Sequence, residues 1–155
     1  MIAIDIDDAK LKTANLHGAD ICINSKSSPS LQEEVFDHAH EGVAYTLDAI
    51  GNQSVITAAI NILKRRGKHI QVGLLSPDKK ITPISMDKII AYELEIKGSH
   101  GMQAFRYQEM LELIDQGKLK PQNLISDRIG LEKGVDALQN MDQFESEGVQ
   151  VITSF

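Results

Sequence analysis

The sequence predicts an α/β fold in which short, mostly parallel strands alternate with helices. Two observations support this prediction. Short apolar runs, such as residues 2–5 and 43–50, alternate along the chain with segments that carry apolar residues at helical spacing. At 155 residues the chain is one domain's worth of material, long enough to bury a sizeable core.

The expected elements follow one another in a regular order. The expected strands are short apolar runs, and they cover residues 2–5, 20–24, 43–50, 68–75, 94–98, 124–129 and 149–152. A further extended segment, weakened by Pro83, is expected at residues 80–84. The expected helices have apolar residues at helical spacing, and they cover residues 9–16, 31–40, 52–63, 86–92, 105–116 and 132–141.

Residues that favour helix ends flank several of these segments. The expected N-terminal caps are Asp7 with Asp8, Asn52 and Ser85. The expected helix ends lie at Gly18, Gly67 and Gly117. The basic run at residues 64–66 is then expected at the end of a helix, where positive charge complements the helix dipole.

Composition argues against several classes of partner. A net charge of −6 and an isoelectric point near 5.3 disfavour a nucleic-acid partner, because phosphate binding needs clustered Lys and Arg. Cys22 is the only cysteine, so neither an internal disulfide nor a cysteine-rich zinc site is expected. No apolar stretch reaches the length that a membrane-spanning helix needs. We therefore expect a cytoplasmic protein with no membrane partner.

A carboxylate at the tip of the first strand is the most informative single feature. Asp5 ends the apolar run at residues 2–5, and the first helix follows at once. In dinucleotide-binding sheets an acid in this place accepts hydrogen bonds from the two ribose hydroxyls. Such an acid lies about 20 residues after a glycine-rich turn that holds the pyrophosphate. In this sequence no glycine-rich turn precedes Asp5, so we expect a dinucleotide-binding chain that begins one strand late.

Several segments, in their order and spacing, resemble the second half of medium-chain, zinc-type alcohol dehydrogenases. The resemblance implies an α/β fold with an incomplete Rossmann-type parallel sheet, which has helices on both faces, lacks its first strand and is followed by a C-terminal α+β segment. It implies a truncated dinucleotide-binding domain at residues 1–101 and a segment at residues 102–155 that in the family packs on the catalytic domain. The resembling segments are residues 4–6 with Lys10, 16–20, 47–51, 67–74 and 94–99.

The resemblance also implies NAD as the cofactor. Asp5 corresponds to the acid that binds the adenosine ribose, which favours NAD over NADP because a 2′-phosphate would be repelled. Lys10 corresponds to a lysine near the same ribose. The other implied cofactor-binding residues follow later strands and are Ala49, Ile50, Gly51, Val72, Gly73, Leu74, Ser99 and His100.

Ordinary structural roles also account for several of these residues. Asp5 places negative charge near the start of a helix, which is favourable in itself. Lys10 alone is typical of a solvated helix residue. Gly51 and Gly73 are typical of turns, and His100 is typical of a loop.

The resemblance implies that the catalytic zinc ligands belong to an N-terminal domain outside this sequence. No catalytic and no metal-binding residue is therefore expected here, and the glycine-rich loop that binds the pyrophosphate is not expected either. His38 and His40 have no third ligand nearby and are expected at a solvated helix end. Gln150 stands where some relatives have an arginine near the pyrophosphate.

Three functions remain open. The first is the cofactor-binding fragment of an NAD-dependent alcohol dehydrogenase, which transfers hydride between an alcohol and nicotinamide only together with the N-terminal catalytic domain. The second is a non-catalytic homo-oligomer without a cofactor, joined through the unpaired edges of the strands at residues 2–5 and 43–50. The third is a zinc-independent, quinone-reductase-like relative, which would also need the glycine-rich loop.

Overall fold

The computed structural model describes residues 1–77, 81–141 and 148–155. These residues form two compact units. The first comprises residues 1–3, 7–22 and 102–155, and the second comprises residues 4–6 and 23–101. The division into domains at residues 1–101 and 102–155 stays a prediction.

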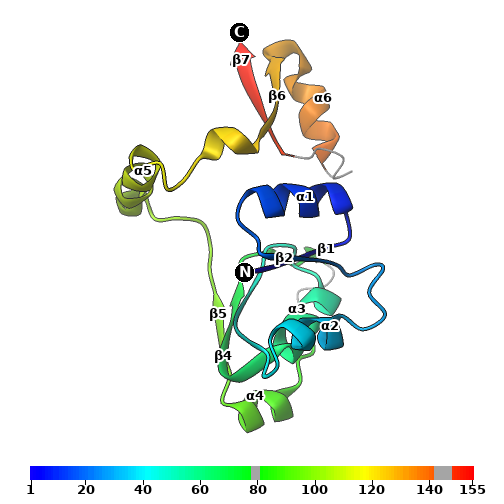
Figure 1. The fold of residues 1–155 in the computed structure, drawn as a ribbon. Helices are drawn as coiled ribbons and strands as arrows, with labels where there is room; N and C mark the ends of the chain where they lie inside the picture. Colours follow the sequence, from blue (N-terminus) through cyan, green and yellow to red (C-terminus); the bar gives the residue numbers. More distant parts are fainter. Residues whose placement is uncertain (78–80, 142–147) are drawn as a thin grey trace. The chain divides into compact units, whose positions relative to one another are not determined.

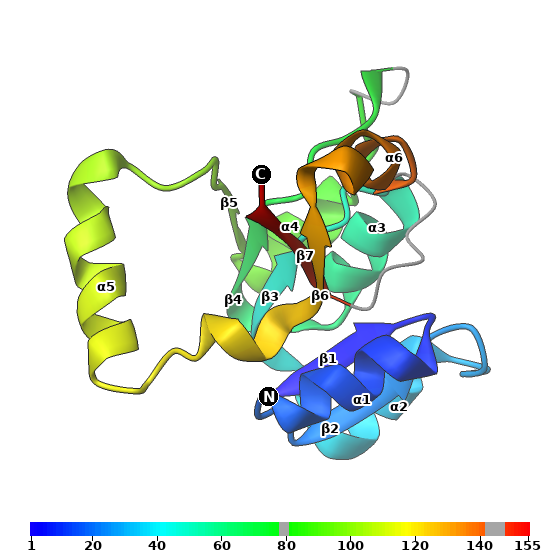
Figure 2. The ribbon, with the colours of Figure 1, turned by 90° about the horizontal axis from the view of Figure 1, so that it is seen from above.

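The second unit is built around a parallel sheet in the order β3-β4-β5. Its strands are β3 (Val43–Asp48), β4 (Leu63–Gln71) and β5 (Glu95–Gly98). Parallel neighbours need a crossover connection, and here each crossover contains a helix, α3 (Gln53–Asn61) or α4 (Met86–Tyr92). Figure 2 shows β3 and β4 side by side in the same direction. This connectivity brings the carboxyl ends of all three strands to one edge of the sheet.

The apolar core of this unit joins α3 to the sheet. Ile56 and Ile60 project from the buried side of α3 and pack in one cluster with Leu63 and Leu94. The spacing of four residues places both isoleucines on one face of the helix. Half-buried apolar side chains surround the cluster, and they are Val43, Leu75, Ile84, Ile89 and Tyr92.

The first strand pairs only with the second along the described chain. β1 (Ile2–Asp5) and β2 (Ile21–Asn24) form a two-stranded sheet. The amide of Asp20 donates to the carbonyl of Met1 at 2.9 Å, and the amide of Ser25 donates to the carbonyl of Asp5 at 3.0 Å, so the strands run in the same direction. In the part of the chain that the structure describes, no ladder joins this pair to β3.

Along the chain, helix α1 (Asp8–Leu16) follows β1, and helix α2 (Leu31–His38) follows β2 (Figure 1). The side chain of Asp7 accepts a hydrogen bond from the amide of Ala9 at 2.8 Å, which confirms the predicted N-terminal cap. The segment after residue 101 then contributes α5 (Tyr107–Asp115), β6 (Ile125–Gly130), α6 (Gly134–Gln139) and β7 (Val149–Ser154). Strands β6 and β7 pair in parallel. The same segment also contains short 3₁₀ turns at residues 104–106, 121–124 and 131–133.

The predicted α/β fold with parallel strands is confirmed, but one helix–strand boundary is wrong. Helix α3 ends at Asn61, so Gly67 and the basic run at residues 64–66 belong to β4 instead of a helix end. The register with β3 shifts in this region, and Arg66 adopts a φ of 58°. A Cβ on Gly67 would lie 2.8 Å from the carbonyl oxygen of Lys64. The chain therefore bulges where a helix terminus was expected.

Two smaller predictions differ from the structure in detail. Ser85 is the N-cap residue of α4, as predicted, but its side chain makes no capping hydrogen bond to the backbone; its hydroxyl donates to the carboxylate of Asp87 at 2.5 Å. Residues 81–84 form no regular strand, and Lys80 lies outside the described residues. The expected N-terminal cap at Asn52 is confirmed, and so is the expected helix at residues 86–92.

Candidate cofactor site

Three strand ends meet at the carboxyl edge of the β3-β4-β5 sheet. Gln71, the last residue of β4, pairs in register with Asp48 at the end of β3 and with Gly98 at the end of β5. The predicted residues at positions 49–51, 72–74 and 99–100 directly follow these ends. Ligands of open α/β sheets bind outside the carboxyl ends of the strands. The topology therefore brings most of the predicted site to the expected edge.

Asp48 holds two of the three turns together. Its backbone carbonyl accepts hydrogen bonds from the amides of Val72 and Gly73, both at 2.9 Å. Its carboxylate accepts the amides of Ile50 at 2.6 Å and Gly51 at 3.1 Å. The residue is 2% exposed. Through its side chain and its backbone carbonyl, this one buried residue fixes both glycine turns, which explains why β3 and β4 end earlier than predicted.

The surface of this edge combines apolar side chains with backbone groups. Ile50, Val72 and Leu74 are exposed beside the two turns. The amide of Ser99 donates to the carbonyl of Gln71 at 2.8 Å, which places the turn after β5 beside the turn after β4. Ala49, Ser99 and His100 are exposed as well, the last two in the turn after β5. A ligand with a ring system could make apolar contacts on this surface and hydrogen bonds to the polar groups beside them.

Gly51 takes a backbone conformation that other residues avoid. Its φ is 80°, and a Cβ there would lie 2.2 Å from the carbonyl oxygen of Leu74. A turn role is therefore established for this glycine. A cofactor role is compatible with it, since the same close packing brings the backbones of both turns to the surface.

The remaining two predicted residues lie in different units. Asp5 ends β1 and is half-buried, and its carboxylate accepts the amide of Ile6 at 2.7 Å. Lys10 lies in the first turns of α1 and is also half-buried. The structure thus places the acid at the end of a strand, as the ribose role requires, and the lysine on a helix.

A row of buried polar side chains behind the edge was missed by sequence reasoning. Thr46, Asp48 and His69 are buried, and Gln71 is half-buried, although all four lie in strands. The available signal was a pair of polar residues two positions apart near the end of each strand, a spacing that places both side chains of a pair on one face.

Comparison with known proteins identifies the family. Residues 1–116 match the sequence profile of the zinc-binding dehydrogenases. The chain belongs to this family. It is 27% identical over 152 residues to a sorbitol dehydrogenase of Bacillus subtilis and 26% identical over 153 residues to an NAD-dependent alcohol dehydrogenase of Sulfurisphaera tokodaii. Each alignment covers 98% of this chain and 42% of the relative, so the chain spans less than half the length of these dehydrogenases.

Solved structures of alcohol dehydrogenases share the fold. The alcohol dehydrogenase of Aeropyrum pernix superimposes with a TM-score of 0.82 at 25% identity, over 98% of this chain and 42% of that one. The benzyl alcohol dehydrogenase of Acinetobacter calcoaceticus gives a TM-score of 0.86 at 20% identity, with the same coverage. The chain therefore corresponds to the C-terminal, cofactor-binding half of such a zinc-binding dehydrogenase.

The residues that the structure describes do not fit a zinc ion, despite the family name. Within residues 1–77, 81–141 and 148–155, no group of three His, Cys, Asp or Glu is placed to hold a metal. We therefore assign no step to zinc on this chain. Across the same residues, no helix is long and apolar enough to span a membrane.

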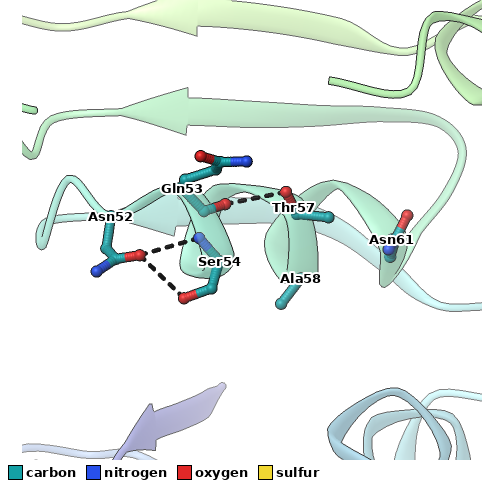
Figure 3. Close-up of a pocket in the computed structure, with 6 residues that line it drawn as sticks. All are labelled: Asn52, Gln53, Ser54, Thr57, Ala58 and Asn61. Atoms are coloured by element: carbon teal, nitrogen blue, oxygen red, sulfur yellow. Dashed lines mark hydrogen bonds between the residues drawn. The ribbon is translucent and has the colours of Figure 1, made fainter. Parts of the chain in front are cut away.

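A shallow depression lies on α3 and is lined by residues from Asn52, directly after the predicted Gly51, to Asn61 (Figure 3). Its polar groups largely bond to one another: Asn52 Oδ1 accepts both the amide and the hydroxyl of Ser54 at 2.9 Å, and the Thr57 hydroxyl donates to the Gln53 carbonyl at 2.9 Å. The Asn52 bonds cap the N-terminus of α3, and the Thr57 bond returns to the backbone of the same helix. None of the predicted cofactor-binding residues lines the depression.

Proposed function

We propose that this chain is the NAD-binding part of an NAD-dependent, zinc-type alcohol dehydrogenase. Membership of the zinc-binding dehydrogenase family supports the proposal. The observation that carries it is the carboxyl edge of the β3-β4-β5 sheet, where the turns after all three strands lie side by side. This edge brings together the exposed apolar side chains and the backbone groups that a dinucleotide cofactor needs.

Each predicted cofactor-binding residue has a definite role in the proposal. The carboxylate of Asp5 accepts hydrogen bonds from the adenosine ribose and disfavours a 2′-phosphate by charge repulsion. The turn at residues 49–51 lies along the ribose groups. Backbone groups at residues 72–74 and at Ser99 orient the nicotinamide amide, and His100 directly follows Ser99. Lys10 belongs to the adenosine ribose instead. When bound, NAD supplies the acceptor for hydride removed from the alcohol.

The alcohol itself is held elsewhere in the proposal. The chain spans 42% of the length of the dehydrogenases that it resembles, and its described residues offer no metal site. The oxidation of an alcohol therefore depends on an N-terminal catalytic domain as partner. Alone, the chain binds NAD weakly and turns over no substrate.

A fluorescence titration of the full chain with NADH tests the proposal. Binding should enhance the emission of the reduced nicotinamide, because the ring leaves water for an apolar surface. NADPH should bind more weakly, owing to its 2′-phosphate. A flat titration at millimolar NADH would remove the proposed function and leave only family membership.

A homo-oligomer without a cofactor is a second candidate, favoured by the exposed face of β3. Tyr45 and Leu47 lie on the same face of this strand and are 64% and 65% exposed. Exposed apolar side chains on a sheet are typical of an interface. Sedimentation velocity distinguishes the candidates: a stable dimer that Leu47→Glu dissociates, and that ignores NADH, supports the oligomer. The exposed leucine of α1, in the variant Leu16→Glu, is the matched control.

A further inference from the structure

We propose that Thr46, His69 and Gln71 act as positioning residues for the cofactor-facing turn at residues 49–51. They form, with Asp48, a continuous row of hydrogen bonds that we call the strand relay. The Thr46 hydroxyl lies 2.9 Å from His69 Nδ1, and His69 Nε2 lies 3.0 Å from Gln71 Oε1. The Gln71 amide nitrogen then donates to Asp48 Oδ2 at 2.9 Å. The inference rests on the proposed NAD site.

The hydrogen bonds of the strand relay have one direction. The Gln71 amide nitrogen donates to Asp48 Oδ2 and also to the Gly73 carbonyl at 2.8 Å, and both of these oxygens act as acceptors. The amide oxygen of Gln71 therefore faces His69, which must carry its hydrogen on Nε2. In the neutral ring, His69 Nδ1 then accepts from the Thr46 hydroxyl. Each member fixes the orientation of the next.

Register and burial explain why the strand relay is continuous. Thr46 pairs with His69 across the β3–β4 ladder, and Asp48 pairs with Gln71. Residues two apart on a strand share a face, so all four side chains lie on the same side of the sheet. His69 is 1% exposed. A polar group so deeply buried is costly unless it is hydrogen-bonded, and each ring nitrogen here has a partner.

The strand relay ends on the proposed cofactor surface. Its last hydrogen bond is accepted by Asp48 Oδ2, and the same carboxylate accepts hydrogen bonds from the amides of Ile50 and Gly51. Gln71 also bonds directly to the carbonyl of Gly73. A change at Thr46 is thus transmitted through His69 and Gln71 to the two turns that meet NAD. Coupled hydrogen bonds of this kind stabilise one another in a buried site.

The test compares Thr46→Val, which removes the hydroxyl at nearly constant volume, with Thr46→Ser, which keeps it. Gln71→Met breaks the centre of the strand relay at nearly constant length. Ile56→Val, in the core of α3, is the control for a loss of stability without a change in the strand relay. The measurements on the full chain are amide hydrogen exchange at Ile50 and Gly51, the ¹⁵N spectrum of the His69 ring, and NADH affinity.

We expect the wild-type ring of His69 to carry its hydrogen on Nε2. Thr46→Val and Gln71→Met should speed exchange at the Ile50 and Gly51 amides and weaken NADH binding by about threefold to tenfold, the range for one lost hydrogen bond. Thr46→Ser should keep both the amide exchange rates and the NADH affinity close to those of the wild-type chain. Ile56→Val should lower the unfolding midpoint and leave NADH affinity unchanged.

Two results would overturn the inference. One is a His69 ring protonated on Nδ1 alone, and the other is unchanged exchange at Ile50 and Gly51 in both relay variants. If the wild-type chain fails to bind NADH, the proposed function fails, and the exchange data alone then decide whether the strand relay positions the turn.

Discussion

Gly51 and Gly73 are in direct backbone contact at the carboxyl edge of the sheet. A Cβ built on Gly73 would lie 2.3 Å from the amide nitrogen of Gly51 and 2.6 Å from the carbonyl carbon of Ile50. Real Cβ atoms do not approach backbone atoms so closely, and backbone cannot move aside as a flexible side chain can. The turns after β3 and β4 therefore form one rigid unit, which Asp48 secures from behind.

Replacing Gly73 with alanine should separate this pair of turns. We expect Gly73→Ala to lower the free energy of unfolding by about 2 kcal/mol, because the added methyl group overpacks against backbone. Urea denaturation measures the change. Gly98→Ala is the matched control, since a Cβ there meets no heavy atom within 4 Å. Equal stability of the two variants would contradict the close contact.

The core of the second unit should respond to a cavity. Ile60 is 2% exposed and packs in the cluster beneath β4. Ile60→Ala should lower the free energy of unfolding by about 3 kcal/mol, from lost burial and the remaining cavity. Ile81, which is 92% exposed, provides the control. Ile81→Ala should change the free energy of unfolding by about 0.5 kcal/mol or less in the same urea measurement.

The order of the elements could be predicted because periodicity and caps agree along most of the chain. Helix α4 has the predicted bounds, and Asp7 caps α1 as expected. The failure at residues 64–67 has a physical reason. Basic residues and a glycine are typical of a helix end, but they also suit an exposed bulge at the start of a strand. Only pairing with β3, a non-local interaction, decides between them.

The candidate site was predictable in part. Strand ends identify residues 49–51 and 72–74, because parallel strands bring their carboxyl ends to one edge. The role of His69 was not predictable from its own position in β4. Its two hydrogen bonds depend on the register between β3 and β4, which places Thr46 opposite it. Alternating polar residues indicate such a row but do not reveal its partners.

Asp5 should determine the choice of cofactor. Asp5→Asn removes the negative charge while keeping the size of the side chain. If the carboxylate binds the ribose, NADH affinity should fall by about tenfold, as expected for a hydrogen bond to a charged group, and the preference for NADH over NADPH should narrow. Titrations with both cofactors measure the effect. Asp37→Asn, an exposed change of equal charge on α2, should leave both affinities unchanged.

The start of α4 should show a pH dependence that comes from Ser85. Its hydroxyl donates to the carboxylate of Asp87 and, with backbone amides, lowers the pKa of Asp87 below its usual value of 3.8. Because the folded state favours the charged form, this stabilisation is complete above pH 3.8 and is lost as the pH falls through the lower, folded-state pKa. An NMR titration of the Asp87 carboxyl carbon should therefore show a higher pKa in Ser85→Ala. Ser85→Thr keeps a hydroxyl and should retain the lowered pKa; an unchanged titration in Ser85→Ala would assign the shift to the backbone amides alone.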